Sequence, residues 1–200
     1  EWERLARSRI TLPARLTADQ PSFVGRTREL EGLQRAYDDV SQSRRRQVVL
    51  VGGEPGLGKT ALVSQAAVAC HDAGATVAMG SCEADVRAPY RPFIEALGQL
   101  VAAAPPELLH AHVERHGSWL LPLAPGLAHR VEHLPPAISS DPETERFLLF
   151  AAVSDFLAAL SEATPGVPFP RALPWARART PSPRPPTRPP HFYTSFRRTH

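Results

Sequence analysis

The chain has 200 residues, of which 42% are hydrophobic, and a formal net charge of +3, so it can form a folded domain with a core. Residues 1–164 carry 16 basic and 20 acidic side chains, whereas residues 165–200 carry seven arginines and no acidic residue. The positive charge therefore belongs to the C-terminal tail and does not indicate a nucleic-acid-binding surface elsewhere. No apolar run approaches the ~18 residues of a membrane span and no signal peptide opens the chain, so we expect a cytoplasmic protein without membrane contact.

The N-terminal residues 1–20 are rich in arginine and contain Pro13, so we interpret them as a linker or the end of an upstream domain. Because the chain begins with Glu1 and its only methionine is Met79, we expect it to be a piece of a longer polypeptide. Residues 21–164 are predicted to be the folded part. Its first helix is indicated by apolar residues at helical spacing, namely Leu30, Leu33, Ala36, Tyr37 and Val40.

A strand and a helix are predicted next, with a glycine-rich turn between them. Residues 47–51 are mostly apolar and β-branched, which predicts a fully buried parallel strand. Apolar residues recur at helical spacing from Ala61 to Cys70, and Gly74 is predicted to cap the end of this helix. The turn therefore joins a strand end to a helix start.

The turn contains Gly53-Glu-Pro-Gly-Leu-Gly-Lys-Thr60, a complete G-x-x-x-x-G-K-[ST] phosphate-binding loop, and Lys59 is the only lysine of the chain. Glycines let backbone N–H groups converge on a polyphosphate, and the helix N-terminus adds partial positive charge. We expect Lys59 to contact the β and γ phosphates of ATP and the Thr60 hydroxyl to bind Mg²⁺. The predicted nucleotide contacts in the loop are Gly53, Gly56, Leu57, Gly58, Lys59, Thr60 and Ala61.

Three more helices and a strand are predicted after the loop. Residues 75–82 favour a second strand, and Pro92 introduces a helix that extends through Val101. Residues 107–116 are expected to form a helix closed by Gly117. His112 and His116, and also His129 and His133, are spaced four apart, but no third metal ligand accompanies either pair. We therefore expect solvent-facing histidines on amphipathic helices.

The last predicted helix extends to about Ala163. Ser140 or Asp141 can cap its start, Pro142 suits its first turn, and Glu143 lies three residues after Ser140 as in a capping box. Its expected buried side consists of Phe147, Leu148, Phe150, Ala151, Leu157 and Leu160.

Several segments resemble the AAA-type ATPase module of large bacterial regulators, close to the STAND signalling ATPases. They are residues 23–33 (Phe-Val-Gly-Arg-Thr-Arg-Glu-Leu-Glu-Gly-Leu), 48–60 with the phosphate-binding loop, 80–82 with 89–97, and 140–150. In order and spacing they cover about residues 21–164. The resemblance implies a three-layer α/β P-loop NTPase fold of the ASCE/AAA-like class, represented here by its N-terminal part.

The resemblance also implies functional roles. In such modules the Val-Gly-Arg segment packs beside the adenine, so Val24, Gly25 and Arg26 become candidate contacts of the base. These modules act as nucleotide-gated switches in transcriptional regulators, often with a LuxR-type helix-turn-helix. ATP would hold a compact or homo-oligomeric state of the parent molecule, and DNA would be contacted only through a domain absent from this chain.

The resemblance ends at Thr164. Ten prolines occur in residues 165–200, and proline lacks the N–H donor that a central strand needs, so we predict a disordered Pro/Arg-rich tail unable to pack. At this point the family continues with a strand ending in the Walker B carboxylates, whereas no acidic residue follows Glu162. ATP binding is expected, but ATP hydrolysis is not carried over. The tail is either the product of a shifted reading frame or a genuine extension.

Two other interpretations stay open. The chain could be a non-enzymatic remnant that cannot complete its sheet and binds nucleotide weakly or not at all. Alternatively, the ATPase module could be fused to a nucleotide cyclase or serve replication initiation, since such domains recur in several contexts.

Overall fold

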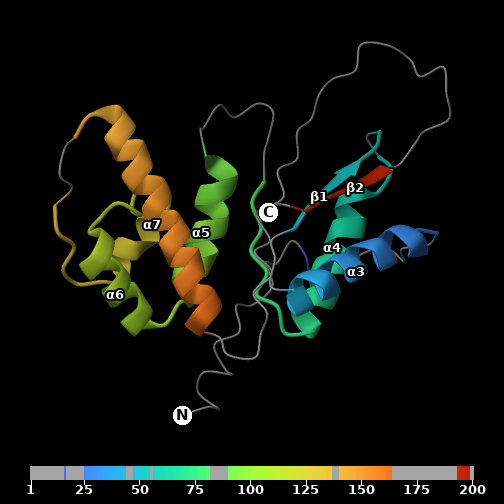
Figure 1. The fold of residues 1–200 in the computed structure, drawn as a ribbon, viewed down its shortest axis with the longest axis horizontal. Helices are drawn as coiled ribbons and strands as arrows, with labels where there is room; N and C mark the ends of the chain where they lie inside the picture. Colours follow the sequence, from blue (N-terminus) through green and yellow to red (C-terminus); the bar gives the residue numbers. More distant parts are fainter. Residues whose placement is uncertain are drawn as a thin grey trace. The chain divides into compact units, whose positions relative to one another are not determined.

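A computed structural model describes residues 16, 25–43, 47–54, 56–81, 90–136, 140–163 and 193–198. These residues belong to two compact units (Figure 1). The loop unit contains α3 (Thr27–Ser43), β1 (Gln47–Gly52), α4 (Lys59–Asp72) and β2 (Tyr193–Arg198). The helical unit contains α5 (Arg91–Ala103), α6 (Pro106–His116), the 3-10 helix η1 (Pro125–His129) and α7 (Pro142–Ala163). The five predicted helices are thus confirmed, and none of the described helices combines the length and hydropathy needed to cross a membrane.

In the loop unit, α3 packs against α4 and β1. The side of α3 that becomes buried carries Gly32, Ala36 and Tyr37, and two of these three were among the predicted apolar positions. The end of α4 is closed as expected, because Gly74 adopts a φ of 98° and its N–H donates to the His71 carbonyl at 2.9 Å. Local sequence signals therefore fix both helices that flank the phosphate-binding loop.

The environment of β1 differs from the prediction. Its side chains alternate in exposure: Val51 is buried, whereas Val48 is 38% and Leu50 is 52% exposed. Its one partner among the described strands is β2, and the two are antiparallel. The prediction of a fully buried parallel strand is wrong for this structure, because such burial requires strands on both edges and helices on both faces.

The tail contributes β2, which contradicts the prediction that no part of residues 165–200 can pack. The pairing runs from Gln47 opposite Arg198 to Gly52 opposite Tyr193. The physical reason lies in the sequence, since the last proline is Pro190 and the following ten residues keep all their N–H donors. Tyrosine, threonine and phenylalanine also favour strands. The rest of the tail, residues 165–192 and 199–200, lies outside the described residues.

The predicted second strand is also wrong. Residues 75–81 form no strand in the structure, and Cys82 lies outside the described residues. Instead, backbone groups of Met79 and Ser81 bond to side chains of α5. Cys70, at the end of α4, has a thiol whose pKa is raised to about 11 by burial and by the nearby Asp38, which suits a structural role.

The core of the helical unit forms where α6 packs on α7 and α5 packs on η1. The most deeply buried side chains are Leu109, Leu120, Leu127, Val101 and Phe156. Arg130 closes the end of α5, because its guanidinium donates to the carbonyls of Val101 at 3.1 Å, of Ala102, and of Ala104 at 2.9 Å. These carbonyls belong to the end of the helix, where intrahelical donors run out.

The start of α7 is capped by Asp141, as predicted. Its Oδ1 accepts the N–H groups of Glu143 at 3.1 Å and Thr144 at 3.0 Å. A hydrogen bond from the Thr144 side chain, followed by those from the N–H groups of Thr144 and Glu143, holds the pKa of the Asp141 carboxyl below its usual value. The predicted capping box is wrong in its partner, because the N–H of Ser140 donates to Glu145 at 3.1 Å and not to Glu143.

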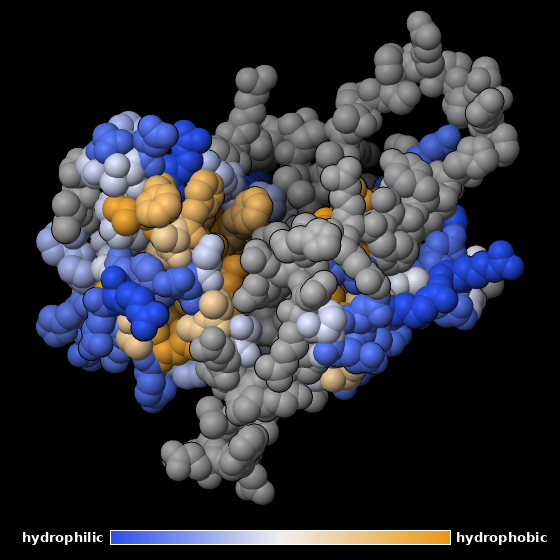
Figure 2. All heavy atoms as spheres, in the orientation of Figure 1, coloured by the Kyte–Doolittle hydropathy of each residue, from blue (hydrophilic) through white to orange (hydrophobic). Residues whose placement is uncertain are grey.

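The predicted buried side of α7 is only partly correct. Leu160 is buried, but Phe147 is 70% and Phe150 is 46% exposed. The stripe that faces the core consists of Ala152, Phe156 and Leu160, spaced four apart, because α6 covers that side of the helix. Figure 2 shows the apolar surface that this arrangement leaves on the helical unit.

The prediction of solvent-facing histidines holds for His129 and His133 but is wrong for His112, which is 5% exposed. The His112 ring stacks on His116, with centroids 4.9 Å apart, and meets the edge of Phe156 at 5.5 Å. His116 Nε2 lies 2.8 Å from Asp155 Oδ2. No group of three or more metal-ligating side chains is arranged to hold an ion within the described ranges.

Candidate nucleotide-binding loop

The three glycines of the phosphate-binding motif adopt backbone conformations that other residues avoid. Their φ angles are 151° at Gly53, 85° at Gly56 and 81° at Gly58. A Cβ on Gly56 would meet no atom within 4 Å, so the backbone conformation and not lack of space requires glycine there. Gly58 is the left-handed residue immediately before α4. The motif thus folds into a turn that carries the chain from β1 to the start of α4.

Lys59 is the first residue of α4, and its side chain folds back over the loop. The Nζ atom donates to the carbonyl of Gly53 at 2.8 Å and to that of Glu54 at 2.6 Å. An ammonium group has three donors, so a third can still reach a phosphate while both of these bonds persist. The loop therefore holds the positive charge in place without using all of its hydrogen-bonding capacity.

The N-terminus of α4 supplies the other groups that a polyphosphate requires. The first N–H groups of an α-helix have no intrahelical acceptor, which here concerns Lys59, Thr60 and Ala61. The N–H of Leu62 donates to the Gly58 carbonyl at 2.9 Å and marks where helical bonding begins. No acidic residue lies in this first turn, so no side chain within it repels an anion.

Thr60 is exposed, in contrast to the buried Leu62 and Ser64 of the same helix. Its hydroxyl is open to a metal ion bound beside the phosphates. Donors and a cation for phosphate, together with a hydroxyl for a hard metal ion, fit Mg-ATP in their chemistry. The residues present in the loop are therefore compatible with this ligand.

The predicted base-side residues are only partly covered by the structure. Val24 lies outside the described residues. Gly25 is exposed with a φ of 93°, and Arg26 lies just before α3, where its guanidinium pairs with Glu29 at 3.3 Å. The Arg26 carbonyl accepts the N–H of Leu30 at 3.0 Å, which starts the helix. Their contact with an adenine remains a prediction.

Two oxygen atoms of the site were not foreseen from the sequence, namely the Gly53 and Glu54 carbonyls that hold Lys59. No side-chain pattern could indicate them, because every residue has a carbonyl and only the loop conformation brings these two together. The glycine spacing was the only available signal.

A glycine-rich loop that joins a strand to a helix N-terminus and carries a lysine defines a P-loop nucleotide-binding module. The chain matches the AAA ATPase domain family over residues 22–182, and it belongs to that family. Family membership implies the P-loop NTPase fold, nucleotide binding and use of Mg²⁺. The match continues past Thr164 into residues 165–182. Neither the comparison with curated proteins nor that with solved structures gave a match.

Proposed function

We propose that this chain binds Mg-ATP as the switch module of a larger bacterial signalling ATPase and that it hydrolyses ATP slowly or not at all. The observation that carries the proposal is the position of Lys59, held over the loop by the Gly53 and Glu54 carbonyls at the start of α4. Backbone N–H groups of Gly56, Leu57, Gly58 and Ala61 would surround the phosphates.

We expect ATP hydrolysis to be impaired in this chain, in contrast to ATP binding. A P-loop ATPase uses a carboxylate after a buried strand to hold Mg²⁺ and to orient the attacking water. No acidic residue follows Glu162, so the segment after α7 contains no such group. Thr60 alone supports the metal in this proposal, and turnover is expected to be far below that of a complete module.

The wider role rests on the family resemblance. We propose a cytoplasmic STAND-like module of a LuxR-type transcriptional regulator, in which ATP stabilises a compact or homo-oligomeric state. DNA would be bound by another domain of that regulator. The chain's own contribution would be the nucleotide-dependent change in stability.

The test is a thermal and equilibrium unfolding experiment on the 200-residue chain with Mg-ATP. A ligand at 100 times its Kd should add about 2.7 kcal/mol to the free energy of unfolding. Lys59→Ala removes the only positive charge on the loop and should abolish most of this gain. Arg35→Ala removes one exposed cation from α3 and should keep the gain, which makes it the matched control. An equal gain in wild type and Lys59→Ala would contradict the proposed site.

A second candidate is a remnant that does not bind nucleotide. The exposed Val48 and Leu50 on β1 favour it, because they lie on a strand that is buried in a complete module. Under this alternative the wild-type chain shows either no cooperative unfolding or no added stability with Mg-ATP at any concentration. A saturable ATP-dependent gain that Lys59→Ala removes would exclude it.

A further inference from the structure

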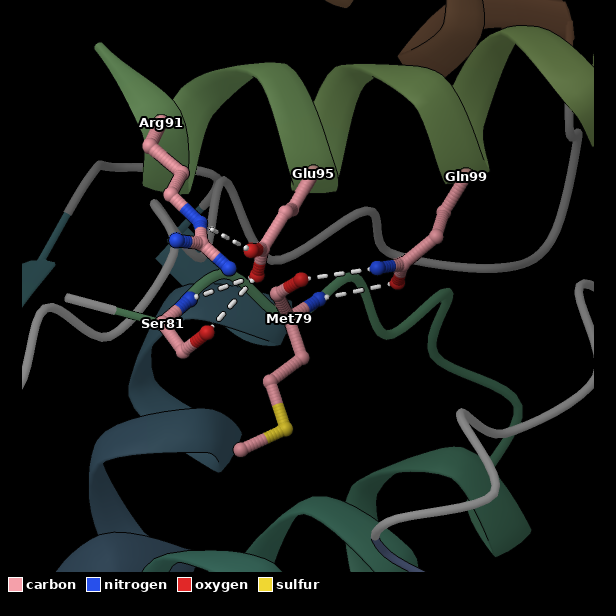
Figure 3. Close-up of polar contacts among 5 residues, drawn as sticks. All are labelled: Met79, Ser81, Arg91, Glu95 and Gln99. Atoms are coloured by element: carbon pink, nitrogen blue, oxygen red, sulfur yellow. Dashed lines mark hydrogen bonds and ion pairs between the residues drawn. The ribbon is translucent and has the colours of Figure 1, made fainter. Parts of the chain in front are cut away.

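Helix α5 of the helical unit holds the segment Met79–Ser81 through side chains (Figure 3). The N–H of Met79 donates to Gln99 Oε1 at 3.0 Å, and Gln99 Nε2 donates to the Met79 carbonyl at 2.7 Å. Glu95 Oε2 accepts both the N–H and the hydroxyl of Ser81 at 2.9 Å. The Gln99 side-chain amide thus makes with Met79 the pair of hydrogen bonds that two facing residues of antiparallel strands exchange.

The spacing of these contacts matches that of a strand edge. In an extended chain the N–H groups of residues i and i+2 point to the same side and lie ~6.7 Å apart. Side chains at i and i+4 of a helix share a face and lie ~6 Å apart along its axis. Glu95 and Gln99 therefore reach Ser81 and Met79 in register, with the helix and the segment running in opposite directions.

The polar groups of this contact are themselves fixed. Arg91 Nε donates to the second oxygen of Glu95, Oε1, at 3.1 Å. Burial acts to raise the pKa of Glu95, but hydrogen bonds from Ser81 and Arg91 outweigh it, and the pKa lies below its usual value. The carboxylate is therefore ionised near neutral pH and remains an acceptor.

Close approach of the helix depends on Gly80, which is buried between the two bonded residues. A Cβ at this position would overlap the backbone carbonyl of Pro92. The first turn of α5 thus packs directly on the segment. This brings α5 close enough for the side chains of Glu95 and Gln99 to bond to the backbone of Ser81 and Met79.

We propose that Glu95 and Gln99 form an edge guard, which occupies the hydrogen-bonding groups on one side of Met79–Ser81 and prevents the same segment of a second copy of this chain from pairing there. Residues 75–81, Ala-Thr-Val-Ala-Met-Gly-Ser, are uncharged, and Thr76 and Val77 among them favour strands. An open strand edge of this kind is a template for association between copies. Side chains from a covering helix deny that edge to a partner.

The test compares wild type with Gln99→Met in the full chain, since methionine keeps the helix propensity and approximate volume of glutamine. Hydrogen exchange of the Met79 amide should become about tenfold faster, because one backbone donor loses its partner. Sedimentation should show concentration-dependent association of Gln99→Met but not of wild type. A synthetic peptide of sequence Ala-Thr-Val-Ala-Met-Gly-Ser should bind the variant and not wild type.

Gln65→Met on α4 is the control, because Gln65 is an exposed helical glutamine in the other unit and should leave all three readouts unchanged. In Glu95→Gln the amide oxygen can still accept from Ser81, so the edge should stay closed. If Gln99→Met unfolds, Glu95→Met provides the second test, because Ser81 then loses its acceptor and the variant should associate. A folded Glu95→Met that does not associate would overturn the proposal. Slow Met79 exchange together with no peptide binding in a folded Gln99→Met would overturn the proposal. Association of Glu95→Gln equal to that of Gln99→Met would do so as well.

Discussion

Acid should destabilise this protein through His112, the buried histidine between α6 and α7. Its ring packs against His116 and Phe156, and its Nε2 atom is buried without a hydrogen-bond partner. The pKa of His112 is lowered from 6.5 to about 4, mainly by burial and less by the nearby His116 and Arg115. The carboxylate of Asp155 acts in the opposite direction. Between these two pKa values, His112 is therefore mostly neutral in the native state and mostly protonated in the unfolded state.

The difference between the native and unfolded pKa values of His112 sets the direction in which stability changes with pH. Above pH 6.5 His112 is neutral in both states, and its contribution to stability is complete. As the pH falls towards 4 the unfolded state takes up the proton, so native stability is lost across this window. With these two pKa values the loss is about 2 kcal/mol at pH 5 and approaches about 3 kcal/mol below pH 4.

The assay is urea unfolding at a series of pH values between 4 and 7 for wild type and His112→Phe. Phenylalanine keeps an aromatic ring beside Phe156 but cannot titrate, so the loss in this window should shrink by about 2 kcal/mol at pH 5. The pair of His116 and Asp155 is present in both proteins and contributes to both curves. His110→Phe replaces an exposed histidine of the same helix and should keep the wild-type slope. Parallel curves for wild type and His112→Phe would refute the reasoning.

Four further substitutions test the packing and caps of the helical unit by the same unfolding assay at pH 7. Gly80→Ala should lower the free energy of unfolding by at least about 2 kcal/mol, because the new Cβ overlaps the Pro92 carbonyl. Gly98→Ala should raise it by about 0.5–1 kcal/mol, because Gly98 lies inside α5 with open space around it. Equal effects of the two substitutions would contradict the packing of Gly80 on α5. Asp141→Ala should cost about 1 kcal/mol by removing the acceptor for the first N–H groups of α7. Arg130→Ala should cost about 1–3 kcal/mol, because carbonyls at the end of α5 lose a charged donor, and no measurable change would argue against that cap.

Helix boundaries were predictable because their signals are local. Gly74 and Gly117 end helices, and Asp141 with Pro142 begins one, through contacts within a few residues. The glycines of the phosphate-binding loop belong to the same class, since their positive φ angles reflect the turn itself.

The burial of side chains and the pairing of strands depend on residues that are distant in the sequence, so local sequence patterns did not predict them correctly. The apolar run of β1 predicted burial, but its exposure depends on which strands and helices cover it. His112 looked like any helical histidine until α7 covered it with Phe156. Residues 75–82 were predicted to form a strand, yet the partner of Met79 is the side chain of Gln99, which no strand pattern can indicate.

The proposed function separates ATP binding from hydrolysis in this chain, because the two activities depend on different lengths of sequence. The groups proposed to bind phosphate lie within Gly53–Ala61, and the loop holds Lys59 through its own carbonyls. Such a site can form even if the sheet beyond β1 is incomplete. Activation of water needs a carboxylate delivered by another strand, and the chain has no acidic residue after Glu162 to supply it. A wild-type chain that gained stability with Mg-ATP and also released phosphate at the rate of a complete module would require a carboxylate from residues before Glu162, and would contradict this separation.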